Sequence, residues 1–430
     1  MKIAMIGTGY VGLVTGTCFS ELGNSVICVD NDTEKIKKLN KGIIPIYEPG
    51  LEELVHKNCE AKRLSFTSDI EEAVKSSDII FIAVGTPPKD SGEADLSSVE
   101  KVSSVIADVM TEYKLVVGKS TVPVNTGKWI KKTINTRNTK GIDFDVASNP
   151  EFLREGSAIN DFLYPDRIVI GVESERAKNI LCELYKPVDA PILVTDIESA
   201  EIIKHASNSF LATKISFINA ISILCERAGA DVQMVAEGMG LDKRIGKQFL
   251  NAGAGFGGFC FPKDLSAFIR IAEDIGYDFK LLKEVERIND EQKKGIVQKI
   301  KESLWNLRGK QVGILGLSFK PNTDDIRYAP SIDIIGELLK EGVKVKAYDP
   351  QAMERTKEVF SDITYCKDPY GVCVGSDALV ILTEWDEFKN LDLKKVKELL
   401  NTAIIIDGRN IFEPKTVREE GFLYTGIGRK

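Results

Sequence analysis

Residues 2–12 read KIAMIGTGYVG, and residues 25–30 read SVICVD. The first segment is an apolar run that ends in closely spaced glycines, and it predicts a strand, a tight turn and a helix over residues 11–22. The second segment predicts another strand that ends at Asp30. This pattern is typical of an open α/β sheet in which right-handed crossovers join parallel strands.

The same alternation continues along most of the chain. Apolar, β-branched runs predict further strands at residues 77–84, 114–119, 143–147, 167–171 and 191–195. Helical periodicity separates them at residues 32–41, 96–110 and 173–185. The pattern returns near the C-terminus, with strands expected at 310–316, 343–349, 378–383 and 403–407 and a helix at 331–340. We therefore expect two doubly wound, Rossmann-like α/β domains.

A different pattern separates these two regions. From about Glu198 to Arg227 there is no Gly or Pro, and apolar residues keep helical spacing. A helix of that length would be about 45 Å long, enough to bridge two domains or to form a subunit interface. We predict three regions: a dinucleotide-binding domain at 1–196, a central long helix and dimerisation region at 197–305, and a second Rossmann-like domain at 306–430.

The composition excludes several classes of protein. The net charge of −7 argues against nucleic acid as a partner, and no run approaches the about 20 apolar residues of a membrane span. The first residues enter a strand directly, so no signal peptide is expected. Eight scattered cysteines without a Cys-x-x-Cys pair predict reduced thiols in the cytoplasm. Two histidines exclude a multi-histidine metal centre, and we expect no metal.

The two α/β regions resemble a diverged internal pair. KIAMIGTGYVG has a counterpart in KQVGILGLSFK (310–320), and VICVDN has one in VKVKAYDP (343–350). The second copy contains an inserted loop, about residues 319–328, at the strand end where open α/β sheets bind ligands. Lys320 and Arg327 in this loop suit a ligand that carries phosphates, although a solvated charged loop would have the same composition.

The first glycine turn predicts a dinucleotide site. Gly7 allows the tight turn, Gly9 allows a pyrophosphate to approach the backbone, and Gly12 allows the helix to pack against the strand. The helix N-terminus favours phosphate. Asp30 follows Gly12 by 18 residues and would bind the adenosine ribose, which favours NAD over NADP. The alternative is a glycine turn that binds no dinucleotide.

One cysteine stands apart from the others. Cys260 follows three glycines in the segment GFGGFCFPKD (255–264), where the glycines free the backbone to wrap a ligand. Lys263 lies nearby, and a cation lowers the pKa of a thiol and so favours the nucleophilic thiolate. The alternative is a small buried residue beside a flexible turn. The remaining seven cysteines are interpreted as packing residues.

The long helix contributes a second candidate pair. Lys204 and Asn208 are four residues apart and share one face of an otherwise apolar helix. A lysine there could stabilise an oxyanion or act as a base, or it could simply extend its amine to solvent. We interpret His205 as structural and expect His56 to face solvent.

A dinucleotide, a nucleophilic thiol and a phosphate-binding loop together predict one chemistry. An alcohol is oxidised to an aldehyde, Cys260 adds to give a thiohemiacetal, a second oxidation gives a thioester, and water releases a carboxylate. Two NAD and one water are consumed. A catalytically silent binding protein and a two-electron dehydrogenase remain as alternatives.

Seven segments carry a family resemblance that runs from Lys2 to about Arg409. They are GTGYVG, VGTPP, KSTVPV, NPEFLREG, AEIIKHASNSFLA, GFGGFCFPKD and GLSFKPNTDDIR. The chain resembles the nucleotide-sugar dehydrogenases, a family with UDP-glucose, GDP-mannose and UDP-N-acetyl-hexosamine members. The resemblance implies NAD-dependent oxidation of UDP-glucose to UDP-glucuronate, with another nucleotide sugar as the alternative. Phe259 departs from the small residue expected beside the nucleophile, and the tail beyond Arg409 carries no recognisable motif.

The resemblance also implies a role for each matched residue. The catalytic set is Cys260, Lys204, Asp264, Glu151, Thr121 and Asn208. The NAD set is Gly7, Gly9, Tyr10, Val11, Gly12, Asp30, Lys35, Thr86, Thr121, Glu155, Lys263 and Arg327. The UDP-sugar set is Glu151, Phe152, Leu153, Lys204, Asn208, Arg244, Phe249, Gly255, Phe256, Gly257, Gly258, Lys320 and Arg409. Arg244 matches an arginine that crosses from a partner subunit, which implies a homodimer through the long helix.

Overall fold

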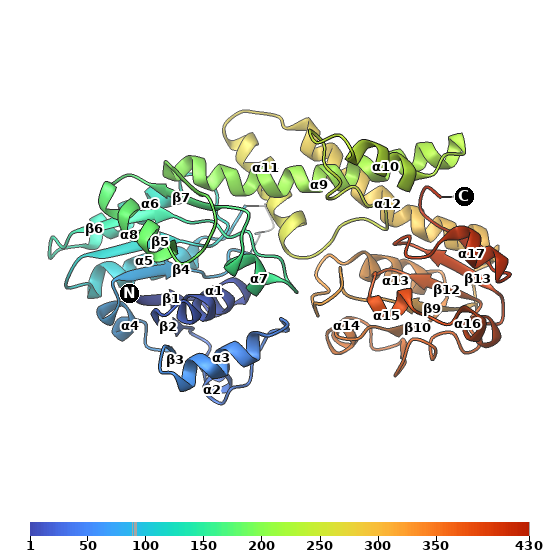
Figure 1. Ribbon diagram of the computed structural model, residues 1–430, viewed down its shortest axis with the longest axis horizontal. Coiled ribbons are helices and arrows are strands. Elements are labelled where there is room, and N and C mark those ends of the chain that lie inside the picture. Colours follow the sequence, from blue (N-terminus) through green and yellow to red (C-terminus); the bar gives the residue numbers. More distant parts are fainter. Residues whose placement is uncertain (88, 90–92, 430) are drawn as a thin grey trace. The chain divides into compact units, whose positions relative to one another are not determined.

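Two sheets, each with helices on both faces, account for most of the chain (Figure 1). The computed structural model describes residues 1–87, 89 and 93–429. Pro88 of the VGTPP segment and Lys430, the last residue of the third predicted region, lie outside the described residues. The chain divides into one unit of Met1–Ser207 and Ser266–Gly276 and another of Asn208–Leu265 and Tyr277–Lys430.

The described part of the first unit contains a sheet in the order β3-β2-β1-β4-β5-β6-β7-β8. Its strands are β1 (Lys2–Ile6), β2 (Ser25–Val29), β3 (Leu64–Thr67), β4 (Ile79–Ile82), β5 (Lys114–Gly118), β6 (Phe144–Ser148), β7 (Ile168–Val172) and β8 (Ile192–Thr195). Its helices are α1 (Tyr10–Glu21), α2 (Thr33–Asn40), α3 (Leu51–Glu60), α4 (Ile70–Ser76), α5 (Ser97–Val109), α6 (Thr126–Arg137), α7 (Ala158–Leu163) and α8 (Glu175–Tyr185). The predicted strands and helices of this region are confirmed within a few residues.

One strand direction differs from the prediction of parallel strands. β6 pairs with β7 in antiparallel register, Ala147 opposite Val172, whereas the other pairings of this sheet are parallel. The short helix α7 connects these two strands in the sequence. Hydrophobic periodicity carries no information about the direction of a strand. The fold is therefore a doubly wound α/β sheet of mixed direction.

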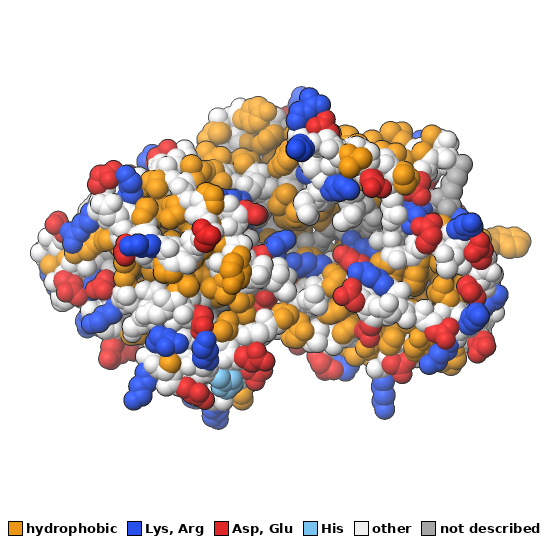
Figure 2. Space-filling model, in the orientation of Figure 1, with side chains coloured by type: hydrophobic (Ala, Val, Ile, Leu, Met, Phe, Trp, Pro, Cys, Tyr) orange, Lys and Arg blue, Asp and Glu red, His pale blue; other side chains and the backbone are white. Residues whose placement is uncertain are grey.

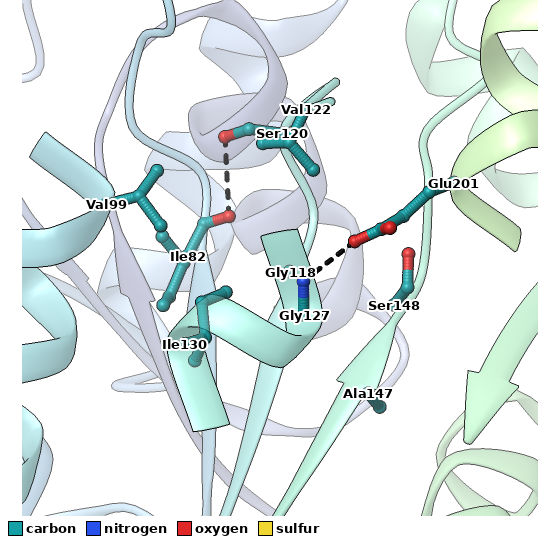
Figure 3. Close-up of a pocket in the computed structure, with 10 residues that line it drawn as sticks. All are labelled: Ile82, Val99, Gly118, Ser120, Val122, Gly127, Ile130, Ala147, Ser148 and Glu201. Atoms are coloured by element: carbon teal, nitrogen blue, oxygen red, sulfur yellow. Dashed lines mark hydrogen bonds between the residues drawn. The ribbon is translucent and has the colours of Figure 1, made fainter. Parts of the chain in front are cut away.

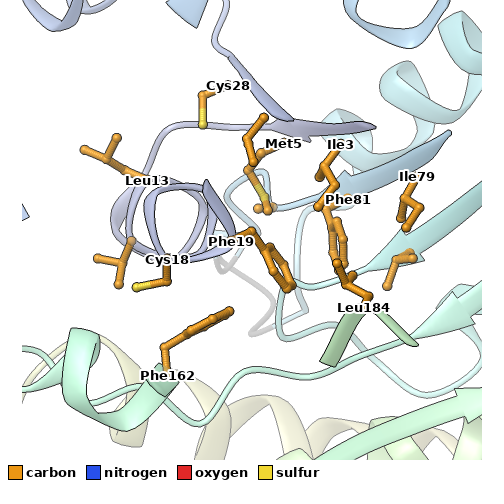
Figure 4. Close-up of a cluster of buried hydrophobic side chains, with 14 of the residues drawn as sticks. Ile3, Met5, Leu13, Cys18, Phe19, Cys28, Ile79, Phe81, Phe162 and Leu184 are labelled. Carbon is orange, nitrogen blue, oxygen red and sulfur yellow. The ribbon is translucent and has the colours of Figure 1, made fainter. Parts of the chain in front are cut away.

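Alternate residues of β1 show how the sheet of the first unit is covered. Ile3 and Met5 face a cluster with α1, α3, α7 and α8, in which Phe19 packs on Phe81 and Phe162 (Figure 4). Ala4 and Ile6 face the opposite cluster with α4, α5 and α6. Each β1 side chain named here is at most 3% exposed, as expected for a strand covered on both faces.

The second unit has a parallel sheet in the order β11-β10-β9-β12-β13-β14 over the residues described. Its strands are β9 (Gln311–Leu315), β10 (Lys344–Tyr348), β11 (Thr364–Tyr365), β12 (Ala378–Ile381), β13 (Ile404–Asp407) and β14 (Leu423–Thr425). Its sheet-covering helices include α13 (Pro330–Lys340), α14 (Met353–Val359), α15 (Asp386–Lys389), α16 (Leu393–Leu399) and α17 (Pro414–Glu419). The C-terminal tail, which carries no motif, supplies the edge strand β14.

Four further helices complete the described part of the chain: α9 (Ile197–Ala228), α10 (Val232–Gly240), α11 (Cys260–Asp274) and α12 (Lys280–Leu304). The predicted long helix is confirmed as α9, which contributes residues to both units. α9 is also the one helix of the described residues that is long and apolar enough, by length and composition only, to cross a membrane. The sequence of α9 still contains no continuous run of about 20 apolar residues, and a core helix of a soluble protein meets the same criterion of length and composition.

The surface and the thiols agree with the composition. Acidic and basic side chains are interspersed over the face of the molecule that Figure 2 shows. All eight cysteines are free thiols, and Cys260 is exposed whereas the others are buried or half-buried. Within the described residues, no group of three or more His, Cys, Asp or Glu side chains could hold a metal ion.

Candidate active site

The first glycine turn of the first unit is built as a dinucleotide site requires. Gly7 has φ +105°, and a Cβ on it would lie 2.5 Å from the Ala83 carbonyl oxygen. A Cβ on Gly12 would lie 1.9 Å from the Gly7 carbonyl oxygen, so both positions require glycine. Gly9, in contrast, has open space where a Cβ would be, and no side chain caps the N-terminus of α1 at Gly9–Val11. This turn therefore offers the space and the helix N-terminus that suit a pyrophosphate.

Asp30 lies at the end of β2 and organises the same turn. Its Oδ2 accepts hydrogen bonds from the Thr8 amide (3.0 Å) and hydroxyl (2.6 Å), and the Lys35 ammonium lies 2.8 Å away. Burial raises the pKa of Asp30, but Lys35 and Thr8 outweigh it and bring the pKa down to about 2. The carboxylate is therefore charged at neutral pH, which favours a ribose diol over a ribose 2′-phosphate and so fits NAD.

Tyr10, the first residue of α1, leads to a residue that sequence reasoning missed. Its hydroxyl donates to the buried Glu48 carboxylate, which also accepts the amides of Gly156 (2.6 Å) and Ala158 (2.7 Å). Glu48 thus ties the glycine turn to the segment that carries the half-buried Glu155. The segment YEPG around Glu48 signals a turn, but nothing local indicates that its carboxylate is buried.

Three loops at the carboxyl ends of β4, β5 and β6 carry the other candidates of this unit. The hydroxyl of Thr86 donates to the carbonyl of Thr121 (2.9 Å), which joins the first two loops. In the third loop, the buried Glu151 lies 3.0 Å from the ammonium of Lys204 and accepts the Leu153 amide at 2.6 Å. Lys204 is therefore buried and ion-paired, which excludes the interpretation that it extends to solvent.

Phe152 lies beside this ion pair. The Lys204 ammonium is 5.3 Å and the Arg167 guanidinium 3.7 Å from its ring centre, so the ring stabilises two cations. His205 is buried, and its Nε2 is 2.8 Å from the Val122 carbonyl oxygen, in agreement with a structural role. His56 is exposed, as expected.

Glu201 on α9 holds the start of α6, a contact that sequence reasoning also missed. Its carboxylate accepts the backbone amides of Asn125 (2.6 Å) and Gly127 (2.8 Å), and it lines a cavity of about 10 Å³ (Figure 3). Burial raises the pKa of Glu201 to about 7, although the two amides lower it. Because this loop also contains Thr121, Glu201 fixes the backbone around a candidate catalytic residue.

In the second unit, Cys260 is the first residue of α11. It is exposed, so the alternative of a buried packing residue is wrong. Lys263 and Asp264 follow one turn later, with their charged groups 2.6 Å apart, and the Asn208 amide donates to Asp264 at 2.6 Å. Asp264 is fully buried. The thiol thus lies at a helix N-terminus, which stabilises negative charge, one helical turn before Lys263 and Asp264 of this polar cluster.

The packing of the segment before Cys260 requires its glycines. A Cβ on Gly255, Gly257 or Gly258 would lie within 2.7 Å of Asn289, Tyr328 or Phe319, respectively. Gly255 and Gly258 also have positive φ. The segment is therefore tightly packed against its own unit. Asn289 reinforces it by pairing with both backbone groups of Phe256 (2.8 and 3.0 Å).

Arg409 and Arg327 hold the loops around this segment. The Arg409 guanidinium donates to the carbonyls of Gly255 (3.1 Å) and Phe319 (3.3 Å), and Arg327 forms a two-pronged pair with the buried Asp325. Arg327 also lies 4.2 Å from the ring centre of Phe259. The inserted loop is thus partly buried, which excludes a fully solvated one.

Three substrate candidates remain in the second unit. Phe249 has a left-handed backbone (φ +65°), a strained conformation for an aromatic residue, and it packs 6.1 Å from Phe261. The half-buried Lys320 lies 5.4 Å from the Phe319 ring centre. Arg244 has a side chain that is 89% exposed and pairs only locally in the contacts described, with Asp242.

Comparison with known proteins identifies the family. Residues 1–189 match the NAD binding domain of the UDP-glucose/GDP-mannose dehydrogenase family, residues 198–291 its central domain, and residues 313–414 its UDP binding domain. The chain is 51% identical over 429 residues to the UDP-glucose 6-dehydrogenase TuaD of Bacillus subtilis (strain 168), covering 100% of this chain and 93% of the relative. It is 47% identical over 436 residues to the UDP-glucose 6-dehydrogenase of Rhizobium meliloti (strain 1021), covering 100% of both chains.

Comparison with solved structures identifies the same family. The UDP-glucose dehydrogenase of Pyrobaculum islandicum has a TM-score of 0.93 at 43% identity, covering 100% of this chain and 98% of that one. The UDP-D-ManNAc dehydrogenase of Pyrococcus horikoshii has a TM-score of 0.88 at 29% identity, covering 100% and 99%. The expected fold, enzyme class and cofactor are therefore confirmed. This chain belongs to the UDP-glucose/GDP-mannose dehydrogenase family and is an NAD-dependent oxidoreductase.

Proposed function

We propose that the enzyme oxidises the primary alcohol of the glucose in UDP-glucose to a carboxylate, giving UDP-glucuronate. The observation that carries this proposal is the exposed Cys260 at the start of α11, next to the cluster of Asn208, Lys263 and Asp264. Oxidation to an aldehyde alone needs no thiol, whereas oxidation to an acid needs a nucleophile to add to the aldehyde. The full-length relatives named above are UDP-glucose 6-dehydrogenases, which supports the choice of sugar.

The proposed reaction passes through an aldehyde, a thiohemiacetal and a thioester. The alcohol carbon loses a hydride and a proton to give an aldehyde, and the Cys260 thiolate adds to it to form a thiohemiacetal. Loss of a second hydride gives a thioester. Water then attacks the carbonyl carbon, the C–S bond breaks, and the thiolate is restored. NAD bound at the glycine turn would accept one hydride, so two NAD, bound one after the other, are needed for the two oxidations.

Different residues of the chain are proposed to stabilise the oxyanion, to activate water and to bind the two ligands. Lys204 and Asn208 offer N–H donors to the developing oxyanion, and Asp264 orients Asn208. Glu151 is the proposed base that activates water, with Thr121 supporting that water.

The proposed binding residues for the UDP-sugar are Lys320, Arg409 and the packed loop from Gly255 to Gly258, together with Phe152, Leu153, Phe249 and Phe256. The proposed binding residues for NAD are Lys35, Thr86, Glu155, Lys263 and Arg327.

We further propose a homodimer through α9. Phe210, Phe217 and Leu224 are spaced by seven residues, so they form one stripe of the helix, and they are 65%, 48% and 59% exposed. Such a row of exposed apolar side chains is typical of a subunit interface. Arg244, exposed in this chain, is the residue proposed to reach the partner's substrate. We also propose a cytoplasmic enzyme without membrane or nucleic-acid partners, consistent with its free thiols.

The decisive experiment counts products. The protein is incubated with NAD and, separately, with UDP-glucose, UDP-N-acetylglucosamine, UDP-N-acetylmannosamine and GDP-mannose, and NADH and nucleotide-sugar acid are quantified. Two NADH for each UDP-glucuronate support the proposal. One NADH for each product, or turnover of another sugar without turnover of UDP-glucose, contradicts it.

A further inference from the structure

Lys119 is a buried lysine that the proposed mechanism leaves without a task. It follows β5 directly, is 4% exposed, and lies in the first unit at the same sheet edge as Glu151. Its ammonium nitrogen lies 2.9 Å from Asn149 Oδ1 and 3.4 Å from the Tyr185 hydroxyl. Lys119 occurs in the family segment KSTVPV, but its position there indicates no function.

The partners of Lys119 are neutral, and their orientation is fixed. Asn149 Nδ2 donates to the Val169 carbonyl (2.8 Å), so its Oδ1 must face Lys119, and Tyr185 donates to the same Oδ1 at 2.6 Å. Within the described residues, Lys119 forms no ion pair. Burial therefore lowers the pKa of Lys119 to about 7, with Lys204 lowering it further and Glu151 raising it. The amine can gain or lose a proton at neutral pH.

A small cavity connects this amine with the proposed base. Its volume is about 40 Å³, and both Lys119 and Glu151 line it. That volume exceeds what one water molecule needs, and the polar groups around it can hold one. The other titratable or charged groups that face Lys119 or this cavity are Asp161 of α7, Arg167, Tyr185 of α8 and Lys204 of α9.

We propose that Lys119 acts through Glu151. It receives from Glu151 the proton that is released when water attacks the Cys260 thioester. This inference rests on the function proposed above. Glu151 takes one proton from the attacking water, the C–S bond breaks and the sulfur leaves as thiolate. The protonated Glu151 passes its proton through the cavity to the neutral amine of Lys119. The resulting ammonium releases the proton to solvent, and both groups return to their starting forms.

A purely structural role would tie β5 to β6 and α8 through Asn149. Two matched variants separate this role from proton transfer. Lys119→Met keeps the length and apolar stem of the side chain but has no amine. Tyr185→Phe removes a hydrogen bond to the same Asn149 oxygen but leaves the amine in place.

The test measures kcat from pH 5.5 to 9, the melting temperature at each pH, and the fraction of Cys260 acylated in acid-quenched steady-state samples by mass spectrometry. In the wild type, kcat rises as the pH passes through about 7, because the acceptor must be neutral. In Lys119→Met, kcat falls about 100-fold or more, this rise disappears, acylated Cys260 accumulates and the KM for UDP-glucose changes less than about twofold. Lys119→Arg, which stays charged, behaves like Lys119→Met. Tyr185→Phe keeps the rise near pH 7.

Two results would overturn the inference. One is a Lys119→Met enzyme that retains the wild-type pH profile and accumulates no acyl-enzyme. The other is a loss of kcat that follows the loss of melting temperature equally in Lys119→Met and Tyr185→Phe. Both results count only if the wild-type enzyme, measured in parallel, forms two NADH for each UDP-glucuronate. A wild type that forms one NADH contradicts the proposed function itself, and the inference falls with it.

Discussion

Asp30 and Asp349 occupy equivalent positions in their two sheets and accept the same kinds of hydrogen bond, but only the Asp30 side chain retains exposure to solvent. Asp30 accepts the amide and hydroxyl of Thr8, and Asp349 accepts those of Ser318 at 3.1 and 3.0 Å. Asp349 is fully buried and also accepts the indole N–H of Trp385 at 3.1 Å, whereas the Asp30 side chain is 10% exposed. The internal repeat thus has one carboxylate available for a ligand and one used for structure.

This contrast predicts opposite effects of removing each carboxylate. Asp30→Ala is expected to raise the KM for NAD about tenfold or more, while the KM for UDP-glucose changes less than about twofold. Asp349→Ala is expected to lower the free energy of unfolding by about 1–3 kcal/mol for each buried donor left without an acceptor. Steady-state kinetics and urea unfolding of both variants test this. Equal effects of Asp30→Ala on both substrates would argue against the ribose role.

The thiol predicts where the reaction stops without it. Cys260→Ser is expected to stall at the aldehyde or at an early covalent stage, because serine is far less nucleophilic at neutral pH and an alkoxide is a poorer leaving group than a thiolate. Quantification of NADH and UDP-glucuronate after long incubation measures the stall. Wild-type yields of the acid from Cys260→Ser would remove the thioester from the mechanism.

The packing of the glycine segment predicts that a single methyl group disrupts it. Gly257→Ala would place Cβ 2.3 Å from the Tyr328 carbonyl oxygen, so the melting temperature and kcat are both expected to fall. Gly238→Ala in α10 is the matched control, since nothing lies within 4 Å of its added Cβ. The control is expected to be neutral or to stabilise by up to about 1 kcal/mol. Unchanged kcat in Gly257→Ala would show that the loop is not held as described.

Glu201 predicts a pH dependence of stability. Because its pKa is about 7 in the folded chain, above the ordinary value of 4.5, the folded state binds more protons than the unfolded state between these pH values. The contribution of Glu201 to the free energy of unfolding is therefore fully present below about pH 4.5 and is lost as the pH rises to about 7. The stability advantage of wild type over Glu201→Gln should shrink across this window and stay constant above it. Melting temperatures at half-unit pH steps measure it, and an advantage that grows with pH would contradict it.

The exposed stripe on α9 predicts the oligomeric state. Phe217→Asp adds charge to the middle of the stripe and is expected to convert the dimer to monomers with loss of activity, because a buried unpaired charge is costly. Light scattering coupled to size-exclusion chromatography measures the mass. Ile275→Asp, an exposed apolar residue (79%) outside the stripe, serves as the control and should keep the wild-type mass. A wild type that is monomeric at working concentration would contradict the proposed dimer.

Local patterns were sufficient for the repeating parts of the fold. Apolar periodicity and glycine placement predicted β1, α1, α9 and the four central strands of the second sheet, but not its edge strands β11 and β14, because these signals arise from neighbours in the sequence. The antiparallel direction of β7 has no such local signal. The inserted loop was found because the two repeats could be compared with each other.

Long-range contacts explain what the sequence did not predict at the site. Gly255–Gly258 meet Asn289, Phe319 and Tyr328, which are distant in sequence, so the tight packing of the loop could not be inferred from its composition. Glu48, Lys119 and Glu201 are ionisable residues whose burial depends on the loops that cover them. The exposed Cys260 and the buried Lys204 were predicted as candidates because each breaks the pattern around it.

The dependence of the glycine segment on residues far downstream has a consequence for biosynthesis. Gly257 and Gly258 contact the 319–328 loop, and Ala254 and Gly255 bond to Gly408 and Arg409, which are translated about 150 residues later. A nascent chain that has emerged only as far as residue 300 lacks these partners, so the segment that carries Cys260 is assembled only when synthesis is nearly complete. Premature termination within the second sheet would therefore leave Cys260 without its supporting loop, and truncated products are expected to be inactive from the start.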